Sequence, residues 1–182
     1  MDELPSLAEL IRKRNALEYE ITALIGRPAA IGHIGEYIAS RIFNISLEQS
    51  ASFKSIDGHF SDGPLELRSV NIKWYAKWEG ILDITPNALP DYYLIMTGPK
   101  SSILTSRNRV RPWTIDHVFL FDANTLVEEL IQRNTKTGIA TSIRSNLWKS
   151  AEIYPTATNS VYILSERQRE ALGFFSAAAI DH

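Results

Sequence analysis

The chain has 182 residues, 45% of them hydrophobic and 22% charged, with a formal net charge of −2. This length suits one domain with its own core, and the absence of cysteine excludes disulfides, thiolate zinc sites and cysteine nucleophiles. The net charge is not that of a strongly basic nucleic-acid binder, so a polyanionic partner would need a local basic patch. No apolar run approaches the ~20 residues that span a bilayer, and the acidic N-terminus lacks the apolar stretch of a secretory signal. We therefore expect a cytoplasmic protein that makes no membrane contact.

The first predicted element is an amphipathic helix from residue 6 to about residue 25. Ser6 followed by Glu9 is typical of a capping box, and Gly26 before Pro28 indicates the end of the helix. Its apolar residues recur at helical spacing: Leu7, Leu10, Ile11, Leu17, Ile21 and Leu24. We expect this helix to pack on its own domain. The alternative is packing on a second copy, which would make a homodimer.

A second helix and a β-hairpin are predicted next. The helix begins near Ile31 and runs to about Phe43, and two strands follow at residues 52–60 and 65–75. The best hairpin turn is Asp62-Gly63-Pro64. The Asp57-Gly58 pair lies too close to that turn for both to be hairpin loops, so Asp57 is expected inside or at the end of a strand.

The rest of the chain alternates strands and helices. The predicted elements are buried strands at 91–97 and 117–121, a helix at 122–133, a short helix or irregular segment at 141–149, a strand at 161–164 and a helix at 165–174. This order predicts a single α/β or α+β domain over residues 1–182, with a mixed central sheet flanked by helices. Residues 1–26 would form its N-terminal helix, and residues 31–175 its core.

The second strand of the hairpin carries the most informative polar residues. Asn71 and Lys73 are two residues apart, so their side chains lie on one face of the strand. A carboxylate from Asp57 beside this lysine suits a metal-dependent phosphodiester hydrolase, in which the acid holds Mg²⁺ and the lysine stabilises phosphate charge or orients a water. The alternative is an exposed edge strand with Asp57 in a turn, and with Glu36 as a favourable charge in the first turn of a helix.

One dense basic run follows the buried strand. Arg107, Arg109 and Arg111 lie close together, and Trp113 follows them. These arginines would grip phosphates, and the indole would stack on an exposed base. The alternative is a solvated loop that Pro112 closes.

The succession of these motifs resembles the PD-(D/E)XK superfamily of restriction-endonuclease-like nucleases, and in particular its small bacterial members. The resemblance spans residues 31–122. It rests on an Ile-Gly-x-x-Gly-Glu helix, an Asp-Gly pair in a strand, a hairpin return ending in Val-Asn-Ile-Lys and a buried strand ending in Thr-Gly-Pro. It implies a restriction-endonuclease-like core with flanking helices.

The resemblance also implies roles for individual residues. Glu36 matches the helix-borne glutamate that several branches use to bind metal, Asp57 the central metal-binding aspartate and Lys73 the motif lysine. The proline that often precedes the aspartate is Ile56 here. Asn71 departs from the pattern, because a second carboxylate is expected at its position. An amide oxygen can ligate Mg²⁺ but brings no charge.

Two functions follow as hypotheses. The first is a nuclease dependent on Mg²⁺ or Mn²⁺ that acts on DNA, with RNA left open, in a setting such as restriction or phage defence. Lys73, Asp57 and Glu36 would be catalytic, and Asp57, Asn71 and Glu36 would hold the metal. The second is an inactive module of the same fold that binds nucleic acid through the arginine run or a protein through the first helix.

Overall fold

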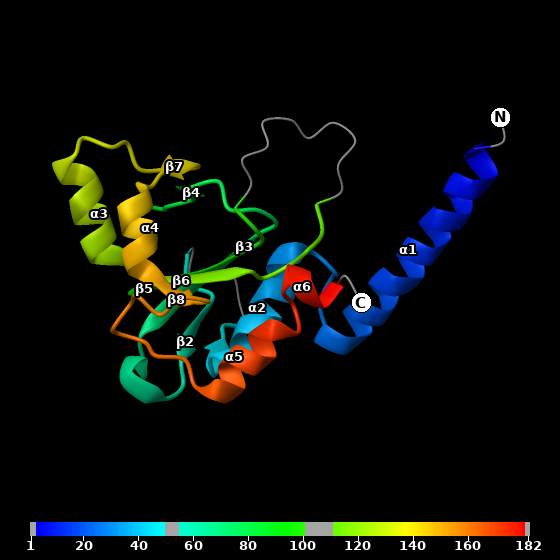
Figure 1. The fold of residues 1–182 in the computed structure, drawn as a ribbon, viewed down its shortest axis with the longest axis horizontal. Coiled ribbons are helices and arrows are strands. Elements are labelled where there is room, and N and C mark those ends of the chain that lie inside the picture. Colours follow the sequence, from blue (N-terminus) through cyan, green and yellow to red (C-terminus); the bar gives the residue numbers. More distant parts are fainter. Residues whose placement is uncertain (1–2, 50–54, 101–110, 181–182) are drawn as a thin grey trace.

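The computed structural model describes residues 3–49, 55–100 and 111–180, and it is an α/β protein built on a six-stranded mixed sheet (Figure 1). The strand order in that sheet is β1-β2-β3-β5-β6-β8. The strands are β1 (Ile45–Leu47), β2 (Gly58–Phe60), β3 (Ser69–Tyr75), β5 (Tyr92–Thr97), β6 (His117–Asp122) and β8 (Glu152–Tyr154). A separate two-stranded ladder pairs β4 (Ile81–Leu82) with β7 (Thr141–Ser142).

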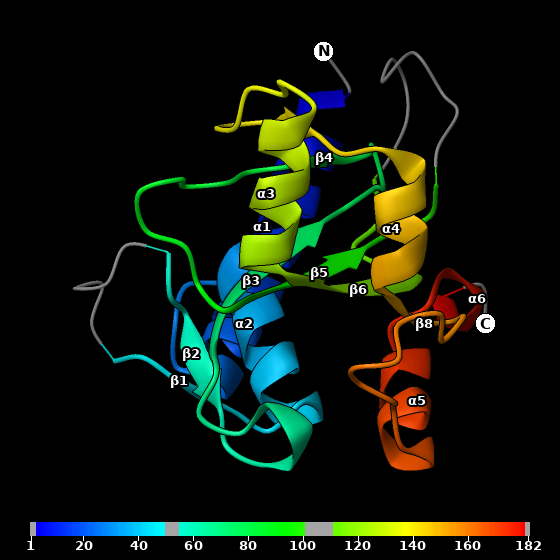
Figure 2. The same cartoon turned by 90° about the vertical axis from the view of Figure 1, so that its left-hand side faces the viewer.

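Helices cover both faces of the sheet (Figure 2). The helices are α1 (Glu3–Ile25), α2 (Ile31–Ile42), α3 (Ala123–Gln132), α4 (Ser145–Ala151), α5 (Glu166–Gly173) and α6 (Ala177–Ile180). One hydrophobic core lies between the sheet and α2 with α5, and a second lies between the sheet and α3 with α4. The predicted mixed sheet with flanking helices is therefore confirmed. No helix among the described residues combines the length and apolar composition needed to cross a membrane.

The central strands divide their side chains between these two cores. Val70, Ile72 and Trp74 of β3 face the α2 side, whereas Tyr93 and Ile95 of β5 face the α3 side. Because β5 is covered on both faces, its sequence is a nearly continuous run of apolar residues. β3 and β5 run parallel, while β3 runs antiparallel to β2.

The predicted hairpin exists, with shorter strands and a wider connection. A short 3-10 turn over Gly63–Leu65 separates β2 from β3, and Gly63 takes the positive φ of +76° that glycine tolerates best. β3 lies between β2 and β5, although β2 pairs only with Ser69 and Val70. The alternative of a solvent-exposed strand face is wrong for Asn71, which is only 4% exposed, while Lys73 is half-buried.

The last predicted strand, at residues 161–164, is also wrong. This segment is extended but pairs with no strand of the described residues, and β8 is the edge strand next to β6 instead. The alternation that predicted a strand has a simpler origin. Tyr162 and Leu164 are buried in the core beside α5, whereas Val161 and Ile163 face solvent.

The first helix does not behave as expected. α1 begins and ends close to the predicted bounds, but it has no buried residue and projects from the body of the molecule (Figure 1). The expectation that it packs on its own domain is therefore wrong for this structure. Its apolar side chains stay exposed along most of its length.

Candidate functional site

Asp57 lies at the point where β2 stops pairing with β3. Its backbone amide donates to the carbonyl of Val70 at 2.9 Å, and its Oδ2 accepts from the backbone amide of Ile72 at 2.6 Å. The carboxylate thus replaces the backbone carbonyl that a longer β2 would have offered to β3. This bond fixes the acid against the sheet immediately before the first residue of β2, whereas the sequence predicted Asp57 inside or at the end of a strand.

Gly58 explains why the Asp-Gly pair is not a turn here. A Cβ at this position would lie 2.8 Å from Cγ2 of Ile45 and closer still to the carbonyl oxygen of Ser46. Glycine is therefore needed because β1 approaches β2 closely, and not because the backbone reverses. The sequence alone cannot separate these two uses of glycine.

Glu36 reaches the site from α2, which packs closely on β3. A Cβ at Gly35 would lie 3.0 Å from Cβ of Trp74, so this glycine lets the helix come near the strand and brings the next residue with it. Glu36 lies in the second turn of α2, so its interpretation as a first-turn charge is wrong. Its carboxylate forms an ion pair with Arg27, which sits in the linker between α1 and α2.

Arg27 is the residue of the site that sequence reasoning missed. It precedes α2 and has no periodic or motif signal of its own. Its contact with Glu36 depends on how the linker turns into the helix. A basic residue close before a candidate acidic ligand is the only hint that the sequence offers.

The charges around Asp57 explain its titration. Burial raises the pKa of the Asp57 carboxyl, and the hydrogen bond from Ile72 opposes that effect. The nearby charge of Glu36 raises the pKa further, whereas Lys73 and Arg27 lower it. One acid and two bases, from α2, β3 and the linker before α2, therefore act on the carboxylate of Asp57. The structure brings together Asp57, Glu36 and Lys73, which the sequence singled out.

Asn71 and Lys73 share one face of β3, as predicted, and it is the face that carries α3 and α4. Asn71 is aligned with Tyr93, and Lys73 with Ile95, both of which belong to the core on that side. Lys73 is half-buried, while Asn71 is only 4% exposed. Its Oδ1 has no hydrogen-bond partner among the described residues, and buried acceptors normally find one.

These oxygens partly fit a divalent cation. Carboxylate and amide oxygens are ligands that Mg²⁺ and Mn²⁺ accept, but the unpaired Oδ1 of Asn71 lies on the α3 side of β3, whereas Glu36 comes from α2 on the other side. Glu36 is already engaged by Arg27. The part of the chain that the structure describes holds no cluster of three or more His, Cys, Asp or Glu side chains suited to a metal. The arrangement therefore fits a site of low charge in which the ion keeps several waters.

The predicted nucleic-acid contacts are only partly described. Arg107 and Arg109 lie outside the described residues, and Arg111 is exposed. Trp113 is 45% exposed and packs edge-on against Trp74 with ring centroids 6.1 Å apart. This packing anchors Trp113 on the body of the molecule.

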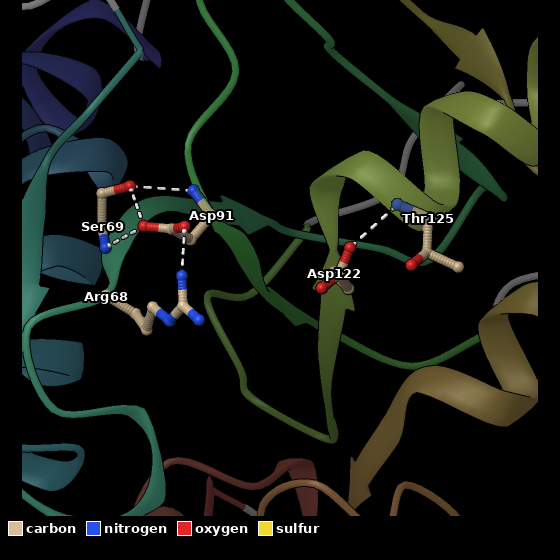
Figure 3. A network of polar contacts seen from close by, with 5 residues as sticks. All are labelled: Arg68, Ser69, Asp91, Asp122 and Thr125. Carbon is tan, nitrogen blue, oxygen red and sulfur yellow. Dashed lines mark hydrogen bonds and ion pairs between the residues drawn. The ribbon is translucent and has the colours of Figure 1, made fainter.

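A second polar network, also missed in the sequence, ties β3 to β5 (Figure 3). Oδ2 of Asp91 accepts from the amide of Ser69 at 2.8 Å and from its hydroxyl at 2.7 Å, and Arg68 donates to Oδ1 at 3.1 Å. In the same view, Asp122 caps α3 by accepting from the amide of Thr125 at 2.8 Å. Both acids stabilise the framework around the site.

The sequence matches no known family model, and no curated protein matches it. The geometry and chemistry of the site are therefore the basis on which a function can be assigned.

Proposed function

We propose that this protein is a phosphodiester hydrolase of the restriction-endonuclease-like class, dependent on Mg²⁺ or Mn²⁺ and acting on DNA. The observation that carries the proposal is the neighbourhood of Asp57. Its carboxylate is fixed on Ile72, and the charges of Glu36 and Lys73 act on it from a helix and a neighbouring strand. An acid held in place between a second acid and a lysine suits phosphodiester hydrolysis.

Each residue would have a distinct task. Asp57 would hold the divalent cation at the edge of β3, with Glu36 from the α2 side of that strand and the amide oxygen of Asn71 from the opposite side. A bound cation would supply Lewis-acid stabilisation of the phosphate and lower the pKa of a water. The ammonium group of Lys73 would neutralise charge on the phosphate and orient the attacking water. Arg27 would hold Glu36 and balance its charge before a cation binds.

A second candidate function is a binding module that keeps this fold without cutting. Two observations favour it. Asn71 is neutral and buried where a second acid is expected, and Arg27 already pairs with Glu36. Because Arg27 already neutralises the charge of Glu36, the site would attract a divalent cation less strongly. The protein would then bind nucleic acid or a protein partner without hydrolysis.

A cleavage assay distinguishes the two functions. Supercoiled plasmid, linear duplex, single-stranded DNA and RNA are each incubated with Mg²⁺, with Mn²⁺ or with EDTA. We expect cleavage of DNA that EDTA abolishes and that Asp57→Asn and Lys73→Ala each reduce about 100-fold or more. Asp62→Asn and Lys77→Ala are matched controls, because both residues lie near the site in sequence and pair with other groups, Asn44 and Glu79.

The opposite result is equally informative. If the wild-type chain cuts no substrate while Asn71→Asp gains metal-dependent cleavage, the native protein is the binding module. If neither chain binds a divalent cation in calorimetry, the assignment of the metal ligands is wrong.

A further inference from the structure

The first helix contains a heptad repeat. Leu10, Leu17 and Leu24 recur at intervals of seven, and a second series three residues before each of them consists of Leu7, Arg14 and Ile21. This is the a/d pattern of a two-stranded coiled coil, with leucine at every d position. α1 spans 23 residues and holds all three of these a/d pairs in one continuous helix.

The apolar residues of this seam do not pack on their own domain. Leu7 is 52% exposed, Leu10 61%, Leu17 59% and Leu24 72%. Helices in proteins take most of their stability from packing an apolar face. Contiguous exposed apolar surface of this kind marks an interaction site.

The seam borders a groove on the body of the molecule. Leu10, Leu17 and Ile21 of the seam line the groove together with Ala29 and Trp113. Its volume is about 430 Å³. Lys13, Arg14 and Glu18 lie at its rim, so the groove has an apolar floor and a charged edge.

We propose that α1 of a second copy of this chain occupies the groove and pairs antiparallel with the first. In an antiparallel pair, a positions lie opposite d positions. The register that sets Arg14 opposite the partner's Leu17 also sets Leu7 opposite the partner's Leu24 and Leu10 opposite the partner's Ile21. All six layers are then filled, and the helices are related by a two-fold axis.

Two charges select this orientation. In a parallel pair Arg14 would meet the Arg14 of the other helix in the seam, whereas the antiparallel pair places it beside leucine and leaves its ion pair with Glu18 intact. Lys13 and Glu20 occupy g positions, which face each other in antiparallel pairs. Lys13 therefore lies beside the partner's Glu20, and symmetry repeats this contact.

The pairing also gives Trp113 a role that is independent of nucleic acid. Trp113 lines the same groove as the seam. The antiparallel arrangement brings the N-terminal half of the partner's helix to the base of α1, where this indole lies. Trp113→Ala is thus expected to weaken the dimer.

The mass of the protein in solution is the first test. Light scattering after size-exclusion chromatography is expected to give twice the monomer mass for the wild type. The double variant Leu10→Glu/Leu17→Glu is expected to be monomeric. Tyr19→Glu is the matched control, because Tyr19 is 79% exposed and lies off the seam, and this variant is expected to remain dimeric. A wild type that stays monomeric at all concentrations overturns the proposal.

Disulfide trapping tests the orientation and does not depend on any variant remaining stable. The chain has no cysteine, so Leu7→Cys and Leu24→Cys each introduce the single thiol of the variant. Under mild oxidation the antiparallel pair forms a disulfide only when the two variants are mixed. Cross-linking of each variant alone indicates a parallel pair and overturns the orientation. A dimer that forms no cross-link in either experiment overturns the use of α1. Cleavage of DNA enters neither test, so failure here is distinct from failure of the proposed activity.

Discussion

The carboxylate of Asp57 accepts a hydrogen bond of 2.6 Å from the backbone amide of Ile72, so one side chain has two tasks. One oxygen completes the hydrogen bonding of β3 just before β2 begins, and the other would be available to the proposed cation. Loss of activity in an alanine variant would thus reflect both lost chemistry and a damaged sheet. The two tasks can be separated by choosing the substitution.

Asp57→Ala and Asp57→Asn are expected to differ in stability although both remove the charge. Alanine leaves the Ile72 amide without its acceptor, which costs about 1–3 kcal/mol for a buried donor. Asparagine keeps an oxygen at the same place, so its free energy of unfolding should exceed that of the alanine variant by about that amount. Urea unfolding of the two variants measures the difference. Equal stabilities would show that the bond to Ile72 does not support the sheet.

The pH dependence of stability at Asp57 has a defined sign. Its pKa in the folded protein lies above the ordinary 3.8, mainly because the group is buried. Its stabilising contribution is therefore fully present below 3.8 and is lost as pH rises through the folded-state pKa. The stability of the wild type relative to Asp57→Asn should fall over that window. Addition of Mg²⁺ at neutral pH should offset the loss in the wild type alone, because a cation favours the ionised acid.

Asp91 is expected to show the opposite dependence. Burial pushes its pKa upward, but the hydrogen bonds from Ser69 and the charge of Arg68 outweigh burial and hold the pKa below 3.8. Its contribution is thus present above 3.8 and is lost as pH falls through the folded-state pKa. Unfolding of wild type and Asp91→Asn between acid and neutral pH measures this. A difference that grows toward acid pH would contradict the role given to Ser69.

The sequence predicted those parts of the site that depend on local order. Asp57 immediately precedes β2 and Lys73 lies on β3, the strand that pairs with β2, so the hairpin brings them close. The shared face of Asn71 and Lys73 follows from the two-residue period of a strand. Glu36 was singled out by the resemblance of its Ile-Gly-x-x-Gly-Glu helix, and the structure shows that this helix packs on β3 through Gly35.

What the sequence could not predict depends on contacts between distant segments. The burial of Asn71 follows from the position of β3 between β2 and β5, which no local pattern specifies. The pairing of Arg27 with Glu36 depends on the turn of a linker. The apolar pattern of α1 predicted the helix but not that its apolar residues stay exposed, because periodicity does not identify the surface that a helix packs against.

Gly58→Ala is expected to be strongly destabilising, because the added methyl group would collide with the backbone of Ser46 and with Ile45. A misfit of this kind in a packed sheet typically costs about 1–3 kcal/mol. Gly32→Ala is the matched control: it lies in the first turn of α2 with open space around it, and alanine there should be neutral or stabilising by up to about 1 kcal/mol. Thermal unfolding of both variants measures the contrast. If Gly58→Ala were as stable as the control, the close approach of β1 would be incorrect.

Asn71→Asp is the substitution that bears most directly on the metal. Its amide oxygen is buried and unpaired, so an ionised carboxylate there would add an uncompensated charge to the buried face of β3. Without metal we expect the free energy of unfolding to fall by about 1–3 kcal/mol or more at neutral pH.

A divalent cation should reverse that loss, since it would bind the folded variant and not the unfolded chain. At 100 times the dissociation constant, binding to the folded state alone adds about 2.7 kcal/mol. Asn87→Asp makes the same change at an exposed position. Its free energy of unfolding should therefore match that of the wild type, with and without the metal. Urea unfolding of both variants with and without Mn²⁺ decides the matter. If Asn71→Asp loses stability and Mn²⁺ restores none of it, Asn71 does not face a cation, and its unpaired oxygen is a cost of the fold alone.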